Sequence, residues 1–259
     1  MEIDVYDHGV FSWIDVTTTD FDASAKFYTE LFGWQVEGGH GKFGGYAMAT
    51  IDGRLVGAIT PGVSPEVPSY WSTYVDVESV DDTLARVTAA RGSIVAGAMD
   101  VGEEGRMAIV TDPEGGLIGL WQAANHNGAG LVNQANTWAW SELLCDDPDK
   151  ESAFYRAVFG WGAQRSGEDE RSGEDESAYT EWQVEGRSIG GMLKKPAEMG
   201  LGPTCWVVYF QVDDVEAATK RVEELGGTVI RAPLEIEPGT VSVVTDPVGA
   251  YFNLFGPKA

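Results

Sequence analysis

The chain has 259 residues, of which 43% are hydrophobic and 22% charged, and this composition predicts a packed globular core. Asp and Glu number 41 against 17 Lys and Arg, and the resulting formal charge of -24 makes nucleic acid and anionic membranes poor partners. No apolar run approaches the length of a membrane span, and the acidic N-terminus lacks a signal-peptide pattern, so we expect a cytoplasmic protein.

The N-terminal part predicts a strand, a helix and three further strands. Alternating character predicts the first strand near residues 10–16. A helix is expected over 22–31, capped by Asp20 or Asp22 and ended by Gly33. Its apolar face is predicted from residues three and four apart, namely Ala23, Phe27, Tyr28 and Leu31. Short strands should follow near residues 34–36, 46–51 and 55–59.

The next stretch repeats this order. It predicts a strand over 72–77, a helix over 80–91 closed by Gly92, and strands near residues 94–96, 106–111 and 117–121. Residues 39–44 satisfy GxGxxG, but a strand rather than a helix follows them, so we interpret them as a hairpin loop and not as a dinucleotide site.

The second half of the chain repeats the first half. "DVTTTDFDASAKFYTELFGW" ends at Trp34, and "ELLCDDPDKESAFYRAVFGW" ends at Trp161. "TDPEGGLIGLW" (111–121) is likewise echoed by "TDPVGAYFNLF" (245–255). The second copy is longer mainly because "RSGEDERSGEDE" (165–176) is a duplicated polar hexapeptide, which predicts a flexible acidic loop. We therefore expect a first domain over 8–122, a small and polar linker over 123–136, and a second domain over 137–256.

These repeated stretches resemble the vicinal oxygen chelate superfamily, which includes glyoxalase I, extradiol dioxygenases and bleomycin resistance proteins, and the resemblance covers nearly the whole chain. Two-domain bacterial glyoxalase-like proteins are the most similar members. The resemblance implies an α+β fold in which four βαβββ units pair into two cup-shaped mixed sheets, with the helices outside and an active site inside each cup.

The resemblance also implies three metal-ligand positions in each cup. They hold Trp13, Ser72 and Gly119 in the first copy and Trp140, Val207 and Asn253 in the second. These side chains are poor ligands for a divalent ion, and the positions of the histidines His8, His40 and His126 in the sequence do not replace them. We therefore predict no metal and no other cofactor, which argues against lactoylglutathione lyase and ring-cleaving chemistry.

Residues two apart along a strand share a face, so each implied ligand position predicts a neighbour inside the cup. The candidate catalytic residues are Asp15, Glu142, Tyr74 and Tyr209. The candidate ligand-binding residues are Trp13, Ser72, Arg106, Trp121, Trp140, Val207, Asn253 and Phe255. Two questions stay open here. The tryptophans could line an open pocket or plug the cups, and each carboxylate could be a general base or be tied to Arg106 or a backbone amide.

Three functions fit these residues. The first is metal-free binding of a small aromatic or carbonyl molecule in an aromatic-lined cup. The second is a lyase, isomerase or hydroxylase that works without the metal and uses the inward carboxylate and tyrosine. The third is an accessory protein whose acidic surface docks a partner enzyme of secondary metabolism. Because the joined repeats can pair their sheets within one chain, both a monomer and a homodimer fit.

Overall fold

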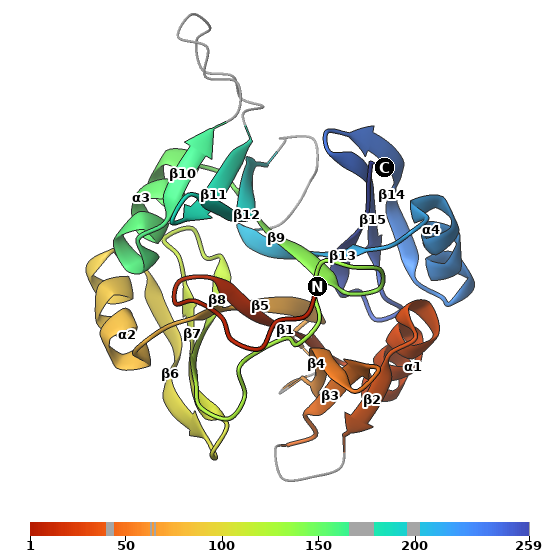
Figure 1. Cartoon of the computed structure of the whole chain (residues 1–259), viewed down its shortest axis with the longest axis horizontal. Helices are drawn as coiled ribbons and strands as arrows, with labels where there is room; N and C mark the ends of the chain where they lie inside the picture. The colour runs from red at the N-terminus through yellow and green to blue at the C-terminus, as the bar shows by residue number, and fades with distance from the viewer. Residues whose placement is uncertain (40–43, 63, 65, 166–178, 196–202, 259) are drawn as a thin grey trace, which may run out of the picture.

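The computed structural model describes residues 1–39, 44–62, 64, 66–165, 179–195 and 203–258. Most of the predicted acidic loop and of the GxGxxG loop lies outside these described residues. Each half of the chain forms one mixed eight-stranded sheet, and the helices lie at the periphery, as predicted (Figure 1). No helix in the described ranges is both long and apolar enough to cross a membrane.

The first sheet has the strand order β2-β3-β4-β1-β5-β8-β7-β6. Its first unit consists of β1 (Phe11–Thr18), α1 (Phe21–Phe32), β2 (Gln35–Gly38), β3 (Ala47–Ile51) and β4 (Arg54–Pro61). Its second unit consists of β5 (Tyr70–Asp76), α2 (Val80–Ala89), β6 (Ser93–Val101), β7 (Gly105–Thr111) and β8 (Leu117–Ala123). The central strands β1 and β5 are antiparallel, whereas β1 and β5 pair in parallel with β4 and β8, respectively.

The second sheet has the equivalent order β10-β11-β12-β9-β13-β16-β15-β14. Its first unit consists of β9 (Trp138–Cys145), α3 (Pro148–Phe159), β10 (Gly162–Arg165), β11 (Thr180–Val184) and β12 (Arg187–Lys194). Its second unit consists of β13 (Cys205–Gln211), α4 (Val215–Glu224), β14 (Thr228–Ile236), β15 (Gly239–Thr245) and β16 (Tyr251–Pro257). The four predicted βαβββ units are therefore all present.

The helix ends follow from local chemistry. The Asp20 side chain accepts a hydrogen bond from the Ala23 amide at the start of α1, and Gly33 ends α1 with φ 72°. At the end of α2 it is Arg91 that takes the left-handed conformation, with φ 71°, while the Gly92 amide donates to the Val87 carbonyl oxygen at 2.9 Å. Glycine is needed at 92 for space, since a Cβ there would lie 2.6 Å from the Thr111 carbonyl oxygen.

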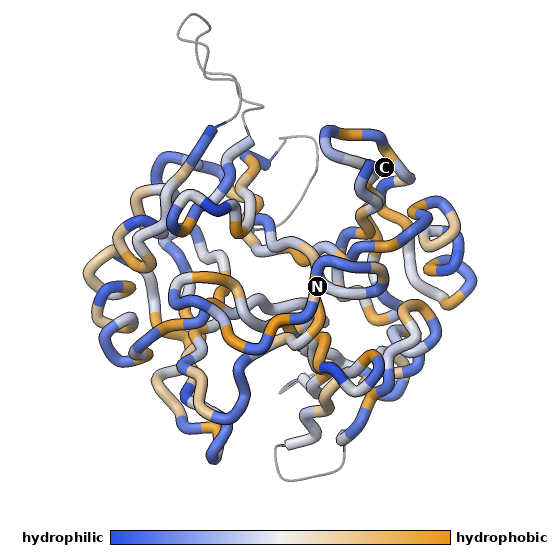
Figure 2. Tube along the Cα trace, in the orientation of Figure 1, coloured by the Kyte–Doolittle hydropathy of each residue, from blue (hydrophilic) through white to orange (hydrophobic). Residues whose placement is uncertain are grey.

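The buried face of α1 is rotated from the predicted one. Ser24, Phe27, Tyr28 and Phe32 are its buried residues, whereas Ala23 and Leu31 are partly exposed. The reason is that α1 packs against the second domain as well as its own. The Phe32 ring lies 4.8 Å from the ring of Phe210, measured between centroids. Figure 2 shows hydrophilic and hydrophobic residues alternating around the helices, as expected for elements with one buried side.

The two domains join through matching contacts on opposite sides of the molecule. Helix α1 lies beside α4, and α2 lies beside α3 (Figure 1). The Tyr28 hydroxyl donates to Asp246 Oδ2 of the second domain at 3.2 Å, and the Tyr155 hydroxyl donates to Asp112 Oδ2 of the first domain at 2.9 Å. Each aspartate belongs to one of the two TDP turns, so the repeated turn has a structural role at the domain interface.

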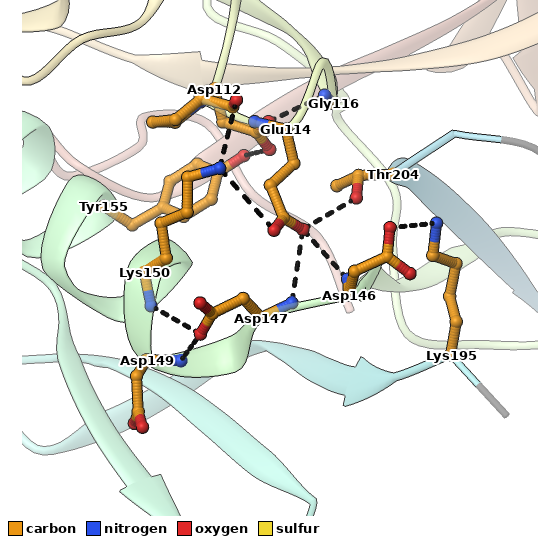
Figure 3. Close-up of polar contacts among 11 residues, drawn as sticks. Asp112, Glu114, Gly116, Asp146, Asp147, Asp149, Lys150, Tyr155, Lys195 and Thr204 are labelled. Atoms are coloured by element: carbon orange, nitrogen blue, oxygen red, sulfur yellow. Dashed lines mark hydrogen bonds and ion pairs between the residues drawn. The ribbon is translucent and has the colours of Figure 1, made fainter. Parts of the chain in front are cut away.

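The interface beside Asp112 also carries a cluster of charged groups (Figure 3). Glu114 Oε2 accepts hydrogen bonds from the Asp146 amide at 2.9 Å and the Thr204 hydroxyl at 3.0 Å. Glu151 is fully buried in α3, where burial and the negative charges of Asp112 and Glu114 raise the pKa of its carboxyl to about 9. The interface therefore holds Glu151 in its protonated form at neutral pH.

Candidate functional site in the two cups

The inward carboxylate of the first cup is held by two phenols. Asp15 on β1 is 3% exposed, and its Oδ2 accepts hydrogen bonds from Tyr74 at 2.9 Å and from Tyr46 at 3.0 Å. The indole of Trp13 donates to the Tyr46 hydroxyl at 2.8 Å. The register of the antiparallel pair β1–β5 places Trp13 opposite Tyr74 and Asp15 opposite Ser72, so these side chains share the inner face of the sheet.

The second cup repeats this arrangement with a glutamate. The Tyr209 hydroxyl donates to Glu142 Oε1 at 2.7 Å, and Tyr179 forms a second phenol–carboxylate hydrogen bond with Glu142. The indole of Trp140 donates to the Tyr179 hydroxyl at 2.8 Å. Each cup therefore contains a tryptophan, two tyrosines and one carboxylate in a single hydrogen-bonded network.

Burial dominates the electrostatics of both networks. It raises the pKa of Asp15 to about 6, although the hydrogen bonds from Tyr74, Tyr46 and Ser72 act in the opposite direction. Burial likewise raises the pKa of Glu142, with the bonds from Tyr209 and Tyr179 opposing it. Each tyrosine keeps its proton, because burial and the adjacent carboxylate raise its pKa well above the usual value. The phenols therefore act as donors, and the carboxylates are the groups that can accept a proton.

The residues at the implied metal-ligand positions do not fit a divalent ion. Gly119 has no side chain, and Trp13 uses its only polar hydrogen on Tyr46. Val207 has no ligand atom, and Asn253 alone is a weak ligand. In the described ranges, no group of three or more His, Cys, Asp or Glu residues could hold a metal ion.

The first cup is closed by the segment that links the domains. His126 of this segment is 8% exposed, and its ring lies edge-on to those of Trp13 and Trp121, at centroid distances of 4.4 and 5.4 Å. The segment is fixed by backbone bonds from Ala129 to Ser12 and from His126 to Glu104, at 2.8 and 3.1 Å. Burial lowers the pKa of His126 to about 4, so the ring is neutral at neutral pH.

The second cup is more accessible than the first. Trp140, Tyr209 and Phe255 are partly exposed, whereas their equivalents Trp13, Tyr74 and Trp121 are 4%, 7% and 6% exposed. Glu142 and Asn253 are buried beneath this aromatic wall, at 7% and 4% exposure. Cys205 lies on β13 at the same parity as Val207 and Tyr209 and is partly exposed, so its thiol also belongs to the inner face.

Arg106 does not hold the carboxylate of the first cup. Its guanidinium pairs with Asp100 Oδ1 at 2.6 Å and Asp81 Oδ1 at 3.2 Å, both within the first domain. Asp15 is tied to Tyr74 and Tyr46 instead, so the structure contradicts the alternative in which Arg106 holds Asp15.

Sequence reasoning missed Tyr46, Tyr179 and His126. The two tyrosines carry a signal that could have found them, because "YAMATIDGRLVG" and "YTEWQVEGRSIG" align without a gap from Tyr46 and Tyr179 onward. His126 carries no comparable signal, since it has no counterpart in the repeat and reaches the cup only through the path of the linker.

Comparison with known proteins gives consistent results for both halves. Residues 10–120 match the family model described as the glyoxalase/bleomycin resistance protein/dioxygenase superfamily, and residues 139–255 match a glyoxalase-like domain. "Putative glyoxylase CFP32" of Mycobacterium bovis is 40% identical over 97% of this chain and 96% of its own length. The anthracycline biosynthesis protein DauV of Streptomyces sp. strain C5 is 32% identical over 95% of this chain and 92% of its own length. In fold, the chain is similar to the 2,3-dioxygenase LapB from Pseudomonas sp. KL28, with a TM-score of 0.67, 15% identity, and coverage of 97% and 94% of the two chains.

Proposed function

Because the chain belongs to the glyoxalase/bleomycin resistance protein/dioxygenase superfamily, we propose that it binds a small aromatic or carbonyl compound in its second cup without the family's metal ion. The observation that carries this proposal is the partly exposed aromatic wall of Trp140, Tyr209 and Phe255 over the buried carboxyl of Glu142. Apolar clefts with a few convergent polar groups are the usual form of small-molecule sites. The first cup, which His126 closes, serves as the structural half of the protein.

A flat aromatic ligand suits this wall. Aromatic side chains bind flat rings by stacking and edge contacts, while the hydrogen-bonded carboxyl at the base fixes their orientation. The relative named for anthracycline biosynthesis supports a fused-ring ligand of the polyketide type, because that similarity extends over both domains.

A second candidate function is proton transfer on the bound molecule. It is favoured by Glu142, a buried carboxyl with a raised pKa and two phenol donors. In this reaction Glu142 would take a proton from a carbon next to a ligand carbonyl. The phenols of Tyr209 and Tyr179 would keep the Glu142 carboxyl hydrogen-bonded before and after the transfer. Glu142→Gln separates the two candidates, because it should abolish turnover in an enzyme and leave binding largely intact in a carrier.

The proposal is tested by titrating the protein with a soluble anthraquinone and with 2-methoxynaphthalene while following tryptophan fluorescence. We expect saturable quenching that Trp140→Phe strongly reduces, whereas the matched variant Trp13→Phe in the closed cup leaves the affinity unchanged. Bound probe should also protect Cys205 from alkylation, and Cys145, which is fully buried, serves as the internal control. Equal effects of the two tryptophan variants would refute the assignment to the second cup, and a stoichiometric divalent ion in the purified protein would refute metal independence.

A further inference from the structure

A crevice of about 290 Å³ adjoins the aromatic wall of the second cup. Its lining is mostly apolar and comes mainly from the second domain and from the segment before β1. The second domain contributes Trp138, Trp140 and Ile189, and the segment before β1 contributes Ile3, Val5 and Tyr6. Its volume is close to the lower end of the range for small-molecule sites. Because Trp140 belongs both to the crevice and to the aromatic wall, a molecule in the second cup lies next to the crevice.

Residues 3–8, the N-terminal segment, are anchored on the linker. The Ile3 amide donates to the Gly130 carbonyl oxygen at 3.1 Å, and the Tyr6 hydroxyl donates to the Ala129 carbonyl oxygen at 2.7 Å. The other amides of the segment donate no backbone hydrogen bond within the part of the chain that the structure describes. Ile3 and Tyr6 are partly exposed, and the remaining residues of the segment are exposed. Segments with few buried contacts open locally at a low cost in free energy.

An exposed ion pair ties the N-terminal segment to the second domain. Asp7 Oδ2 lies 2.5 Å from Arg187 Nη2, and the two side chains are 67% and 60% exposed, respectively. Arg187 is the first residue of β12, and both members of the pair line the crevice. Exposed ion pairs are weak and are weakened further by salt. Breaking this pair would loosen the segment from the second domain while its anchors on the linker stay in place.

The internal repeat supports a covering role for the N-terminal segment. The linker precedes β9 and lies over the first cup, where the Ala129 amide donates to the Ser12 carbonyl oxygen at 2.8 Å. The N-terminal segment precedes β1 in the same way and lies against the second domain. Each domain is thus covered by the segment that leads into the other domain. Backbone bonds hold the linker in place, whereas an exposed ion pair holds the N-terminal segment.

We propose that the N-terminal segment is a movable cover over the crevice, and that the Asp7–Arg187 pair keeps it closed. This inference rests on the proposed function. When the pair breaks, the segment moves away from Trp140 and a molecule enters or leaves the second cup through the crevice. Because the cover has to open for both steps, the pair slows entry and exit by the same factor and leaves the affinity unchanged.

The test is stopped-flow fluorescence with 2-methoxynaphthalene, an uncharged probe whose own encounter with the protein does not depend on salt. Arg187→Gln should raise the association and dissociation rate constants each by about two- to fivefold, the factor by which exposed ion pairs shift an equilibrium. The charge-exchanged variant that combines Asp7→Arg with Arg187→Asp should restore the wild-type rates. Arg221→Gln is the matched control, because it also removes one positive charge and an exposed ion pair between the domains, with Glu30 at 3.2 Å, and it should change neither rate.

A second measurement needs only the wild-type protein. Saturating 2-methoxynaphthalene should slow the hydrogen exchange of the amides in residues 4–8, because the enclosed probe favours the closed cover. Added salt should also raise both rate constants in the wild type and leave those of Arg187→Gln unchanged.

The outcomes separate the inference from the proposed function. If Arg187→Gln changes neither rate, changes only dissociation, or acts no more strongly than Arg221→Gln, the cover is refuted while binding in the cup stands. Unchanged exchange of residues 4–8 on saturation refutes the cover as well. If neither 2-methoxynaphthalene nor the anthraquinone binds, the proposed function fails and the inference fails with it.

Discussion

The ring of Tyr74 lies directly over the α-carbon of Gly119. A Cβ built on Gly119 would come within 2.1 Å of Tyr74 Cδ1, far inside any real contact. The position that the family resemblance assigns to a metal-binding glutamate is therefore occupied by a neighbouring aromatic ring. The same tyrosine donates its hydroxyl hydrogen to Asp15, so the phenol that fills the place of the glutamate also anchors the cup's carboxylate.

This overlap predicts that Gly119→Ala destabilises the first domain. The added methyl group would push Tyr74 off Asp15, and overpacking of this kind costs about 1–3 kcal/mol of unfolding free energy. Urea denaturation followed by tryptophan fluorescence measures the loss. Gly97→Ala is the matched control, because Gly97 is an exposed strand glycine whose Cβ would meet nothing within 4 Å. Equal stability of the two variants would contradict the overlap.

The raised pKa of Asp15 predicts a pH-dependent loss of stability. The folded protein binds one more proton than the unfolded chain between pH 3.8 and about 6, so this contribution is complete below pH 3.8 and is lost as the pH rises through 6. The change amounts to about 3 kcal/mol. Asp15→Asn should remove it, so that the unfolding free energy of the variant rises relative to wild type between pH 4 and 7. An unchanged pH profile would show that Asp15 titrates normally.

The lowered pKa of His126 predicts that its contribution to the unfolding free energy changes with pH in the opposite direction to that of Asp15. Its folded pKa of about 4 lies below the usual 6.5, so stability is complete above pH 6.5 and is lost as the pH falls through 4. The contribution of His126 to the unfolding free energy is again about 3 kcal/mol. In the wild-type protein the contributions of Asp15 and His126 should therefore largely cancel. His126→Phe keeps an aromatic ring against Trp13 and should expose the Asp15 slope. Chemical denaturation at several pH values measures this. If the unfolding free energy of His126→Phe depends on pH in the same way as that of the wild type, the prediction is wrong.

Glu151 at the domain interface predicts a loss of stability in the alkaline range. Its pKa of about 9 means that the stability it contributes is complete below pH 4.5 and declines as the pH rises toward 9. Glu151→Gln cannot ionise and should flatten this decline in thermal or urea unfolding. Ser24 occupies the equivalent place in α1 and donates to Asp246 at 3.1 Å, so Ser24→Ala should lower stability by about 1 kcal/mol at every pH in this range. A wild-type profile that is flat between pH 5 and 9 would argue against the buried carboxylic acid.

The repeated units could be predicted because their signals are local. Capping by Asp20 and the glycine at 33 depend on neighbouring residues, and the structure reproduces both. The first strand also lies where it was predicted, although both of its faces are buried and its burial does not alternate. The parity of side chains along a strand also placed Asp15 and Tyr74 on one face before any register was known.

The remaining features depend on distant contacts. Tyr46 precedes β3 and reaches Asp15 because β3 pairs with β4 and β4 pairs with β1 in the sheet, a pairing that no local pattern specifies. The buried face of α1 follows from contact with the second domain, so Ser24 is buried where an isolated amphipathic helix would place it outside. The pairing of Arg106 with Asp81 joins a strand to a helix across the domain surface, and charge counting could not choose it among 41 acidic residues.

The bonds from Tyr28 to Asp246 and from Tyr155 to Asp112 are related by the internal repeat. Two separate copies of one half could make both of them, as the subunits of a twofold-symmetric dimer do. In such a dimer the two cups would be identical. Fusion into one chain adds a connecting segment, and that segment places His126 against Trp13 of the first cup. The covalent joining of the halves is thus sufficient to break their symmetry, because the segment that joins them gives the first cup a neighbour, His126, that has no counterpart in the repeat.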